Sequence, residues 1–414
     1  MPLLLAAAVL VFAYALVSRR LESSMVTAPM IFTAIGIAIG ALGLFELESL
    51  DTGTVGILAE ATLVLILFTD AIRIDLRRLR EDAALPTRLL VIGLPISVAL
   101  GTLVGYLVLG DLGLISAFVL ATILTPTDAA LGKAVVTDER VPVRIRQTIN
   151  VESGLNDGIM LPIVTVAVAL LVGEPDRTDS TIGALLISEL GLGILMGAVA
   201  GWVGGRLLDL AAAHGNVDGI MRQLGTLAIG VSAFAGAELA GGNGFVAAFV
   251  AGLVFGAVAR DHCEGAYDFA ADEGELLTLL TFLAFGVAVV GPQLSSPTPG
   301  TVIYALLSLT LVRMIPVALS LIGTGLKMPT IGFIGWFGPR GLASIIFDVS
   351  LLEEVGSGVS EPIFSVVVWV VLFSIFLHGL SAAVLSRSYG RWYSEQAEES
   401  MMEAGEVFEH PVRG

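Results

Sequence analysis

The sequence has 414 residues, of which 56% are hydrophobic and only 14% are charged, and its net charge is −17 at pH 7. This composition is too apolar for a soluble globular domain and indicates a polytopic membrane protein, with the lipid bilayer as its first partner. The acidity argues against nucleic acid as a partner, because phosphate binding requires an excess of Lys and Arg. The single cysteine, Cys263, cannot form an internal disulfide.

Apolar stretches of about 17 to 26 residues recur along the whole chain and predict about thirteen transmembrane helices in an all-α fold. Strands are not expected, because the apolar residues are continuous rather than alternating. The first stretch is interpreted as a span and not a cleaved signal, since it lacks a basic start and a small-residue cleavage site. The predicted spans are about 2–18, 25–45, 53–72, 88–109, 112–136, 147–172, 181–205, 221–240, 243–259, 275–291, 301–323, 329–351 and 362–386.

Lys and Arg fall almost entirely on alternate connections between these spans, whereas the other connections contain only Arg177. Because basic residues are retained in the cytoplasm, this pattern predicts that the N-terminus lies outside and the C-terminus inside. The membrane is taken to be the plasma membrane. We expect one transmembrane domain over residues 1–414. Residues 387–414 are predicted to be a short acidic cytoplasmic tail, frayed or partly helical, with no room for a nucleotide-binding regulatory domain.

Two predicted spans contain helix-breaking residues. The fifth span is interrupted at Thr125–Asp128, where Pro126 removes a backbone donor, and the twelfth is interrupted at Gly338–Gly341. Each is the fifth span of a six-span half if residues of about 2–172 and 221–386 form two repeats of opposite orientation. Interrupted helices at matching positions of inverted repeats are typical of the binding site of a transporter.

The sixth predicted span carries four polar residues within one arc of roughly 140° on the helix surface: Glu152, Ser153, Asn156 and Asp157. Asp157 lies eleven residues beyond Arg146, or ~16 Å along a helix, which is near the membrane midplane. Acidic groups at this depth are costly and indicate an ion pathway.

Arg340, on the twelfth span, reaches a similar depth, so we predict a structural ion pair between Glu152 and Arg340. Asp157 would then hold either a proton or a small hard cation, and this competition would couple the two movements. Oxygen ligands suit Na⁺. The candidate ligands are Asp157, Ser153, Asn156, the carbonyl groups freed at Thr125–Thr127, and Asp128, directly or through water.

The E-S-G-L-N-D run at Glu152–Asp157, the T-D of the broken fifth span and the G-P-R-G of the twelfth together resemble the monovalent cation/proton antiporter family. The NhaP-type sodium/proton exchangers are the most similar branch, over essentially the whole chain. The resemblance implies that Asp157 is the cation and proton carrier, supported by Asn156, with Ser153 and the Thr127 carbonyl as further ligands. It also implies a Glu152–Arg340 bridge, electroneutral 1:1 exchange, a homodimer and a moving six-helix bundle.

The sequence departs from this family at two points. Members often have Thr-Asp-Pro on the fifth span, whereas here Pro126 precedes Thr127, which changes the carbonyl expected to face the ion. Relatives often place a Glu on the third span; here the candidate is Asp70, which lies three residues from Arg73 and could instead line the cytoplasmic mouth. Glu60, inside the third span, is interpreted as a hydrogen-bonded structural acid, with a place in a proton path as the alternative, and His378 as a packed, satisfied imidazole. Four further polar residues are interpreted as structural, toward span ends or at helix contacts: Glu189, Glu238, Arg313 and Asp348.

The predicted function is secondary antiport of Na⁺ (or Li⁺ or K⁺) against H⁺, without a cofactor. A K⁺/H⁺ antiporter of the same fold is the first alternative, and a cation channel is the second. A channel is less favoured because channels usually build their pores from several subunits, whereas this chain contains two halves of its own. An enzyme is not expected, because no nucleophile triad, metal-ligand cluster or phosphate-binding glycine loop is present.

Overall fold

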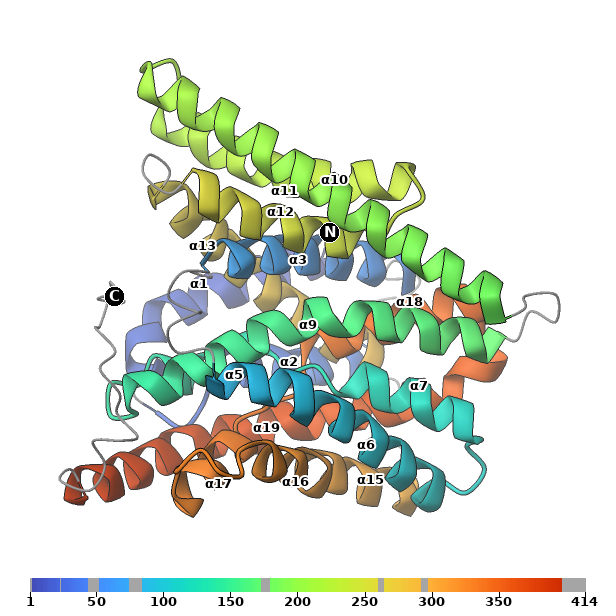
Figure 1. Ribbon diagram of the computed structural model, residues 1–414. Coiled ribbons are helices and arrows are strands. Elements are labelled where there is room, and N and C mark those ends of the chain that lie inside the picture. The colour runs from blue at the N-terminus through green and yellow to red at the C-terminus, as the bar shows by residue number, and fades with distance from the viewer. Residues whose placement is uncertain are drawn as a thin grey trace. The chain divides into compact units, whose positions relative to one another are not determined.

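The computed structural model describes residues 2–22, 24–43, 52–73, 84–172, 179–259, 264–291 and 297–396. Every regular element in these ranges is a helix (Figure 1). The chain forms two compact units. The first unit contains residues 1–56, 84–153 and 279–414, and the second contains residues 57–83 and 154–278.

The helices follow the predicted spans closely, although several spans consist of two consecutive elements. The elements lying wholly in the first unit are α1 (Pro2–Glu22), α2 (Ala28–Ala41), α5 (Ala84–Arg88), the π-helix η2 (Leu89–Gly93), α6 (Leu94–Val108), α7 (Leu114–Leu124), α8 (Ala129–Val136), the π-helix η3 (Phe285–Val290), α15 (Pro299–Leu309), α16 (Leu311–Ser320), α17 (Met328–Trp336), α18 (Leu342–Val355) and α19 (Ser357–Glu395). The second unit contains α10 (Asp179–Ala213), α11 (Gly219–Leu239) and α12 (Gly244–Val258). The boundary between the units falls inside α3 (Thr52–Arg73), α9 (Val143–Val172) and α13 (Glu264–Ala284).

Seven helices in the described chain are long and apolar enough to cross a membrane, and the bent pair α7 and α8 would make an eighth. Several of the shorter helices are apolar as well, among them α2 and α12. The polytopic all-helical architecture is therefore confirmed. The count of thirteen crossings and the inverted repeat remain predictions.

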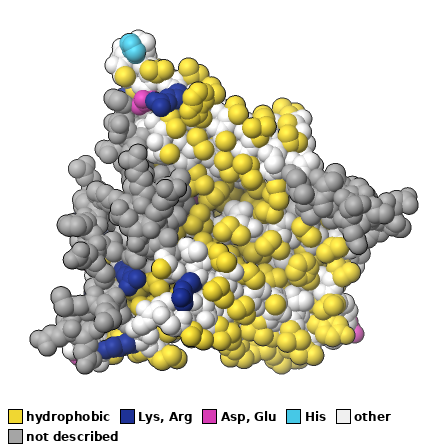
Figure 2. All heavy atoms as spheres, viewed as in Figure 1, with side chains coloured by type: hydrophobic (Ala, Val, Ile, Leu, Met, Phe, Trp, Pro, Cys, Tyr) yellow, Lys and Arg dark blue, Asp and Glu magenta, His cyan; other side chains and the backbone are white. Residues whose placement is uncertain are grey.

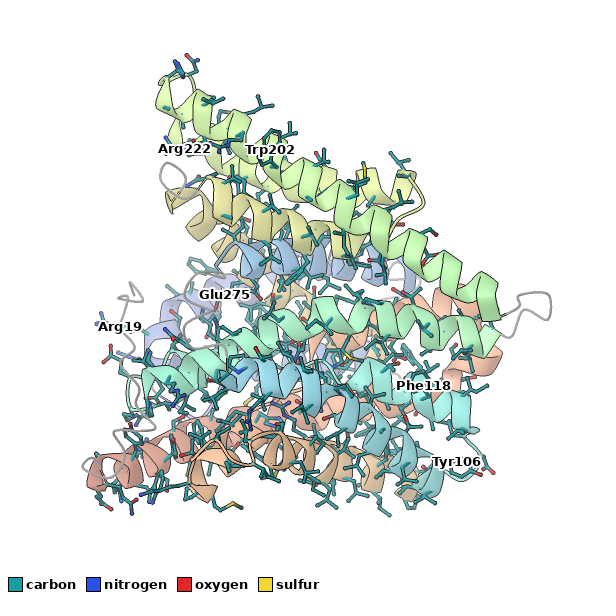
Figure 3. The ribbon with its side chains drawn as sticks, viewed as in Figure 1. Arg19, Tyr106, Phe118, Trp202, Arg222 and Glu275 are labelled. Carbon is teal, nitrogen blue, oxygen red and sulfur yellow. The ribbon has the colours of Figure 1, made fainter. Side chains whose placement is uncertain are left out.

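The outer surfaces of the helices are apolar, as contact with lipid requires. Figure 2 shows hydrophobic side chains over most of the described surface on one face, with few charged groups among them. On α10 the exposed side chains include Leu195, Val199 and Trp202, and Trp202 is labelled in Figure 3.

Glycines spaced by four residues let the helices of each unit pack closely. In the second unit, a Cβ atom on Gly197 of α10 would lie 2.4 Å from the carbonyl oxygen of Ala247 on α12. In the first unit, a Cβ on Gly36 of α2 would lie 2.4 Å from the carbonyl oxygen of Leu283. These contacts are between backbones, so a larger residue at either position would force the helices apart.

Both predicted helix breaks are confirmed. The first separates α7 from α8, whose axes differ by 42° across the break, and the second separates α17 from α18. A third break was not predicted: Thr310, with φ −110° and ψ −89°, separates α15 from α16. It places Arg313 in the first turn of α16.

The predicted tail begins inside α19, because this helix continues to Glu395. Tyr389 is buried there; its ring stacks on Phe333 of α17 with centroids 4.3 Å apart, and its hydroxyl lies 3.0 Å from that of Thr330. The tail therefore starts as a packed helix, and residues 397–414 lie outside the described residues.

Candidate ion-binding site

The two extended segments that interrupt the helices meet inside the first unit. The backbone amide of Asp128 donates to the carbonyl of Pro339 at 2.8 Å. In return, the Nη1 group of Arg340 donates to the carbonyl oxygens of Thr125 and, at 3.1 Å, Pro126. Backbone groups released from a helix need such partners at membrane depth. Each break thus satisfies the polar groups of the other.

Asp128 caps two helices at this crossing. Its Oδ1 atom accepts from the amide of Leu131 in α8 at 2.9 Å, and its Oδ2 atom accepts from the amide of Leu342 in α18 at 2.5 Å. Helix N-termini carry partial positive charge, so the carboxylate is stabilised by both. A Cβ on Gly341 would lie 2.1 Å from Oδ2, so only glycine leaves room for the second cap. Cation binding by Asp128 remains a prediction.

Glu152 pairs with Arg313 rather than with Arg340, so the predicted Glu152–Arg340 ion pair is wrong. The Nη1 and Nη2 groups of Arg313 donate to Oε1 and Oε2 of Glu152 at 2.5 and 2.7 Å, and both residues are at least 95% buried. This two-bonded geometry is the strongest that a guanidinium can form with a carboxylate. Arg340 is already engaged with the carbonyl groups at the crossing.

Arg313 was the functional residue that sequence reasoning missed. It was interpreted as a structural residue toward a span end or at a helix contact, although it is twelve residues beyond Thr301, in the middle of the predicted span 301–323. A lone arginine at the centre of an apolar span is itself a signal of a buried ion pair. The side chain passes Gly338 so closely that a Cβ there would lie 2.2 Å from its Nε atom.

A pair of hydroxyl groups joins the broken helix to α9. The Oγ1 atom of Thr127 lies 2.9 Å from the Oγ atom of Ser153, and both residues are buried. Helix α9 continues without interruption past Ser153, so Asn156 and Asp157 follow three and four residues later on the same face. Both of these residues belong to the second unit and are buried.

Two neighbours in the second unit define the surroundings of Asp157 on α9. A Cβ on Gly158 would lie 3.1 Å from the ring of Phe249 on α12, so this aromatic ring packs beside the residue that follows Asp157. The Cβ atom of Asp70, on α3, is 3.8 Å from the position of a Cβ on Gly154. Asp70 therefore lies beside the polar run, one turn before Asp157, and its role as a ligand remains a prediction.

Helix α19 supports the crossing through Ser374. The hydroxyl of Ser374 accepts from the backbone amide of Arg340 at 2.7 Å and lies 3.1 Å from Nδ1 of His378. The His378 ring is also 5.1 Å from the Trp336 ring at the end of α17, centroid to centroid. His378 is packed as predicted, but the expected satisfied imidazole is found only at Nδ1, because Nε2 has no hydrogen-bond partner within the described part of the chain.

A family model described as "Sodium/hydrogen exchanger, transmembrane" matches residues 6–387. The chain belongs to the sodium/hydrogen exchanger family. This confirms the resemblance stated above, and it confirms the prediction of a transporter and not an enzyme, since the family is one of membrane transporters.

Individual proteins similar to this chain are also named as cation/proton antiporters. A Na⁺/H⁺ antiporter of Schizosaccharomyces pombe is 27% identical over 68% of this chain and 66% of its own length. The K⁺/H⁺ antiporter NhaP of Alkalimonas amylolytica is 27% identical over 89% of this chain and 63% of its own length. The chain thus spans slightly less than two thirds of these relatives. The solved structure of the sodium proton antiporter MjNhaP1 from Methanocaldococcus jannaschii has the same fold, with a TM-score of 0.76, 18% identity and coverage of 93% of this chain and all of that one.

Proposed function

We propose that this protein is a secondary active antiporter of the plasma membrane that exchanges one Na⁺, or Li⁺ or K⁺, for one H⁺. Asp157 is the carrier, and it holds either the proton or the cation. Asn156 supports it, and the oxygen atoms of Ser153 and Thr127 act as further ligands. The proposed assembly is a homodimer with the N-terminus outside and the C-terminus in the cytoplasm.

The observation that carries this proposal is a buried pair of hydroxyl groups in the first unit. Thr127 and Ser153 are held 2.9 Å apart in a buried position, and such neutral oxygen atoms are suitable ligands for a hard monovalent cation. Two acids of the first unit have fixed partners: Glu152 binds Arg313, and Asp128 caps two helices. These two carboxylates are therefore assigned to the framework.

One carboxylate that binds either ligand couples the two flows. A cation cannot leave Asp157 on one side without a proton or another cation replacing it, because a bare carboxylate at membrane depth is costly. Since one positive charge replaces another, the exchange carries no net charge.

The choice between Na⁺ and K⁺ is decided by the spacing of the ligands. The NhaP relative from Alkalimonas amylolytica is named as a K⁺/H⁺ antiporter, so K⁺ is the second candidate for this chain. A single set of flux measurements with Na⁺, K⁺ and Li⁺ distinguishes these cations.

The proposal is tested in proteoliposomes that contain a pH-sensitive dye, with the membrane potential clamped. With wild-type protein, a cation gradient should drive proton movement. Clamping the membrane potential should not change the rate of this proton movement. Asp157→Asn should abolish exchange, whereas Asp111→Asn, at an exposed loop position, should retain it. Full exchange by Asp157→Asn would refute the assigned carrier, and cation flux without a counter-ion would favour a channel.

A further inference from the structure

Asp348 is a buried acid that the proposed transport site does not use. It lies six residues beyond the start of α18 and seven before its end, in the interior of the helix. Its side chain is 99% buried. Within the described part of the chain, its Oδ1 atom has no hydrogen-bond partner.

Asp348 continues a polar line that begins at the helix crossing. The line starts where the amide of Leu342 donates to Asp128, and its next member is Ser344, whose hydroxyl donates to the carbonyl of Ile123 on α7 at 2.8 Å. Asp348 follows Ser344 by four residues and so lies on the same face of α18. At 1.5 Å per residue it is ~9 Å from Leu342 and ~10 Å from the end of α18 at Val355.

The described groups around Asp348 supply no charge to balance a carboxylate. Helix α7 has no ionisable residue. Helix α19 contributes Glu361, which is exposed near its start, and His378, which is bonded to Ser374. Of the buried arginines, Arg313 binds Glu152 and Arg340 binds the carbonyl groups at the crossing.

A carboxylate without a partner in such surroundings is very costly, so the neutral acid is the stable form. A metal cation is not a suitable occupant, because it would need several oxygen ligands. On its own face of α18, the described hydroxyl one turn away is that of Ser344, and one oxygen does not form such a ligand set.

We propose that Asp348 is a second proton-binding carboxyl group, which relays protons along α18 between the crossing and the membrane face at the end of this helix. That face is external in the proposed orientation, and the relay rests on the proposed exchange function. In each cycle the O–H bond of the acid breaks and its proton forms an O–H bond with a water molecule on the side of the crossing, which leaves the Asp348 carboxylate. A proton from external water then restores the acid, so the carboxylate exists only between the two transfers.

Infrared difference spectroscopy tests proton binding without any transport. Wild-type protein at neutral pH should show the carbonyl band of a protonated carboxyl group, and this band should be absent from Asp348→Asn. The asparagine has the same shape as the acid, and Asp348→Ser is a second variant if Asn disturbs packing. If no protonated band is lost in a folded variant, Asp348 is not a proton-binding acid and the proposal fails.

Proteoliposome exchange tests the relay. Asp348→Asn should slow exchange by on the order of tenfold when external protons are scarce, with the half-saturating cation concentration unchanged, and Asp348→Glu should restore the rate. Glu361→Gln, the matched change of an exposed acid on α19, should behave as wild type.

The outcomes separate the two proposals. Normal wild-type exchange together with an unchanged rate and pH profile for Asp348→Asn would overturn the relay alone. Wild-type vesicles that exchange no cation would overturn the antiport function and the relay together.

Discussion

Arg313 and Glu152 are 161 residues apart in the sequence, yet they form a buried ion pair with two hydrogen bonds, at 2.5 and 2.7 Å. The pair fastens α16 to α9 within the first unit. It also neutralises the charge of Glu152, the first residue of the polar run that ends at Asp157. The pair therefore links the framework of the protein to the helix that carries the proposed transport site.

A double-mutant cycle should assign the partner of Glu152. Removing one member of a buried pair leaves a stranded charge and should cost about 3–5 kcal/mol of unfolding free energy. Glu152→Gln combined with Arg313→Met should therefore cost much less than the sum of the two single changes, as measured by denaturant unfolding in detergent. The same cycle between Glu152 and Arg340 should show weak coupling; stronger coupling there would contradict the observed pairing.

Gly341→Ala should destabilise the crossing. The new Cβ would lie 2.1 Å from Oδ2 of Asp128 and would displace the carboxylate that caps α8 and α18, at a cost of about 1–2 kcal/mol or more. Gly332→Ala is the matched control, because no other atom lies within 4 Å of its Cβ position in α17. The control should be neutral or stabilising by up to about 1 kcal/mol. Equal melting temperatures for the two variants would argue against the double cap.

Removing the hydroxyl groups of Thr127 and Ser153 should weaken cation binding more than it lowers the stability of the fold. Thr127→Val and Ser153→Ala should each raise the cation concentration for half-maximal exchange by roughly tenfold, because a lost hydrogen bond or ligand is worth about 1–1.5 kcal/mol. The double variant should be less than additive, since the two hydroxyls contact each other. Thr102→Val on α6 is the control, since this hydroxyl bonds only to its own helix. Unchanged half-saturation in both single variants would remove the two residues from the site.

Tyr389→Ala should lower stability by about 3–5 kcal/mol, as expected for a buried aromatic side chain that is truncated to alanine. The exposed neighbour Arg391→Ala should change it by less than about 0.5 kcal/mol. Thermal unfolding in detergent compares the two. Equal stability of both variants would mean that the end of α19 is not packed on α17.

The loop between α8 and α9 should make a small, pH-dependent contribution to stability. Burial raises the pKa of Asp138, but the hydrogen bonds from Arg140 outweigh burial and hold this pKa below its ordinary value of 3.8. The contribution of the pair is therefore complete at neutral pH and is lost as the pH falls through the folded-state pKa. It should stay below about 1 kcal/mol, because Arg140 is half exposed.

The measurement is the stability difference between wild type and Asp138→Asn, followed from neutral pH to about pH 3, where it should shrink toward zero. Glu139→Gln, at the exposed neighbouring position, should show no such trend. A difference that grows on acidification would mean that the pKa of Asp138 is raised and not lowered.

Much of the architecture could be predicted from local patterns. Continuous apolar runs predicted the helices, and Pro126 and the glycines around Pro339 predicted the breaks, because these residues alter the backbone wherever they occur. The polar run on α9 could also be recognised, since its spacing places the side chains on one helix face. The break at Thr310 was missed because threonine carries no comparable backbone signal.

Composition and short-range patterns were sufficient to establish that the chain is a helical membrane protein, where two of its helices are interrupted, and which acidic residues fall within apolar stretches. These properties depend on composition and on residues a few positions apart. The packing of distant segments was needed to show that Glu152 binds Arg313, that Asp128 caps two helices, and that Arg340 binds carbonyl groups. The physical reason is that a buried charge takes the partner with the best geometry, and geometry between distant segments depends on how the broken helices cross.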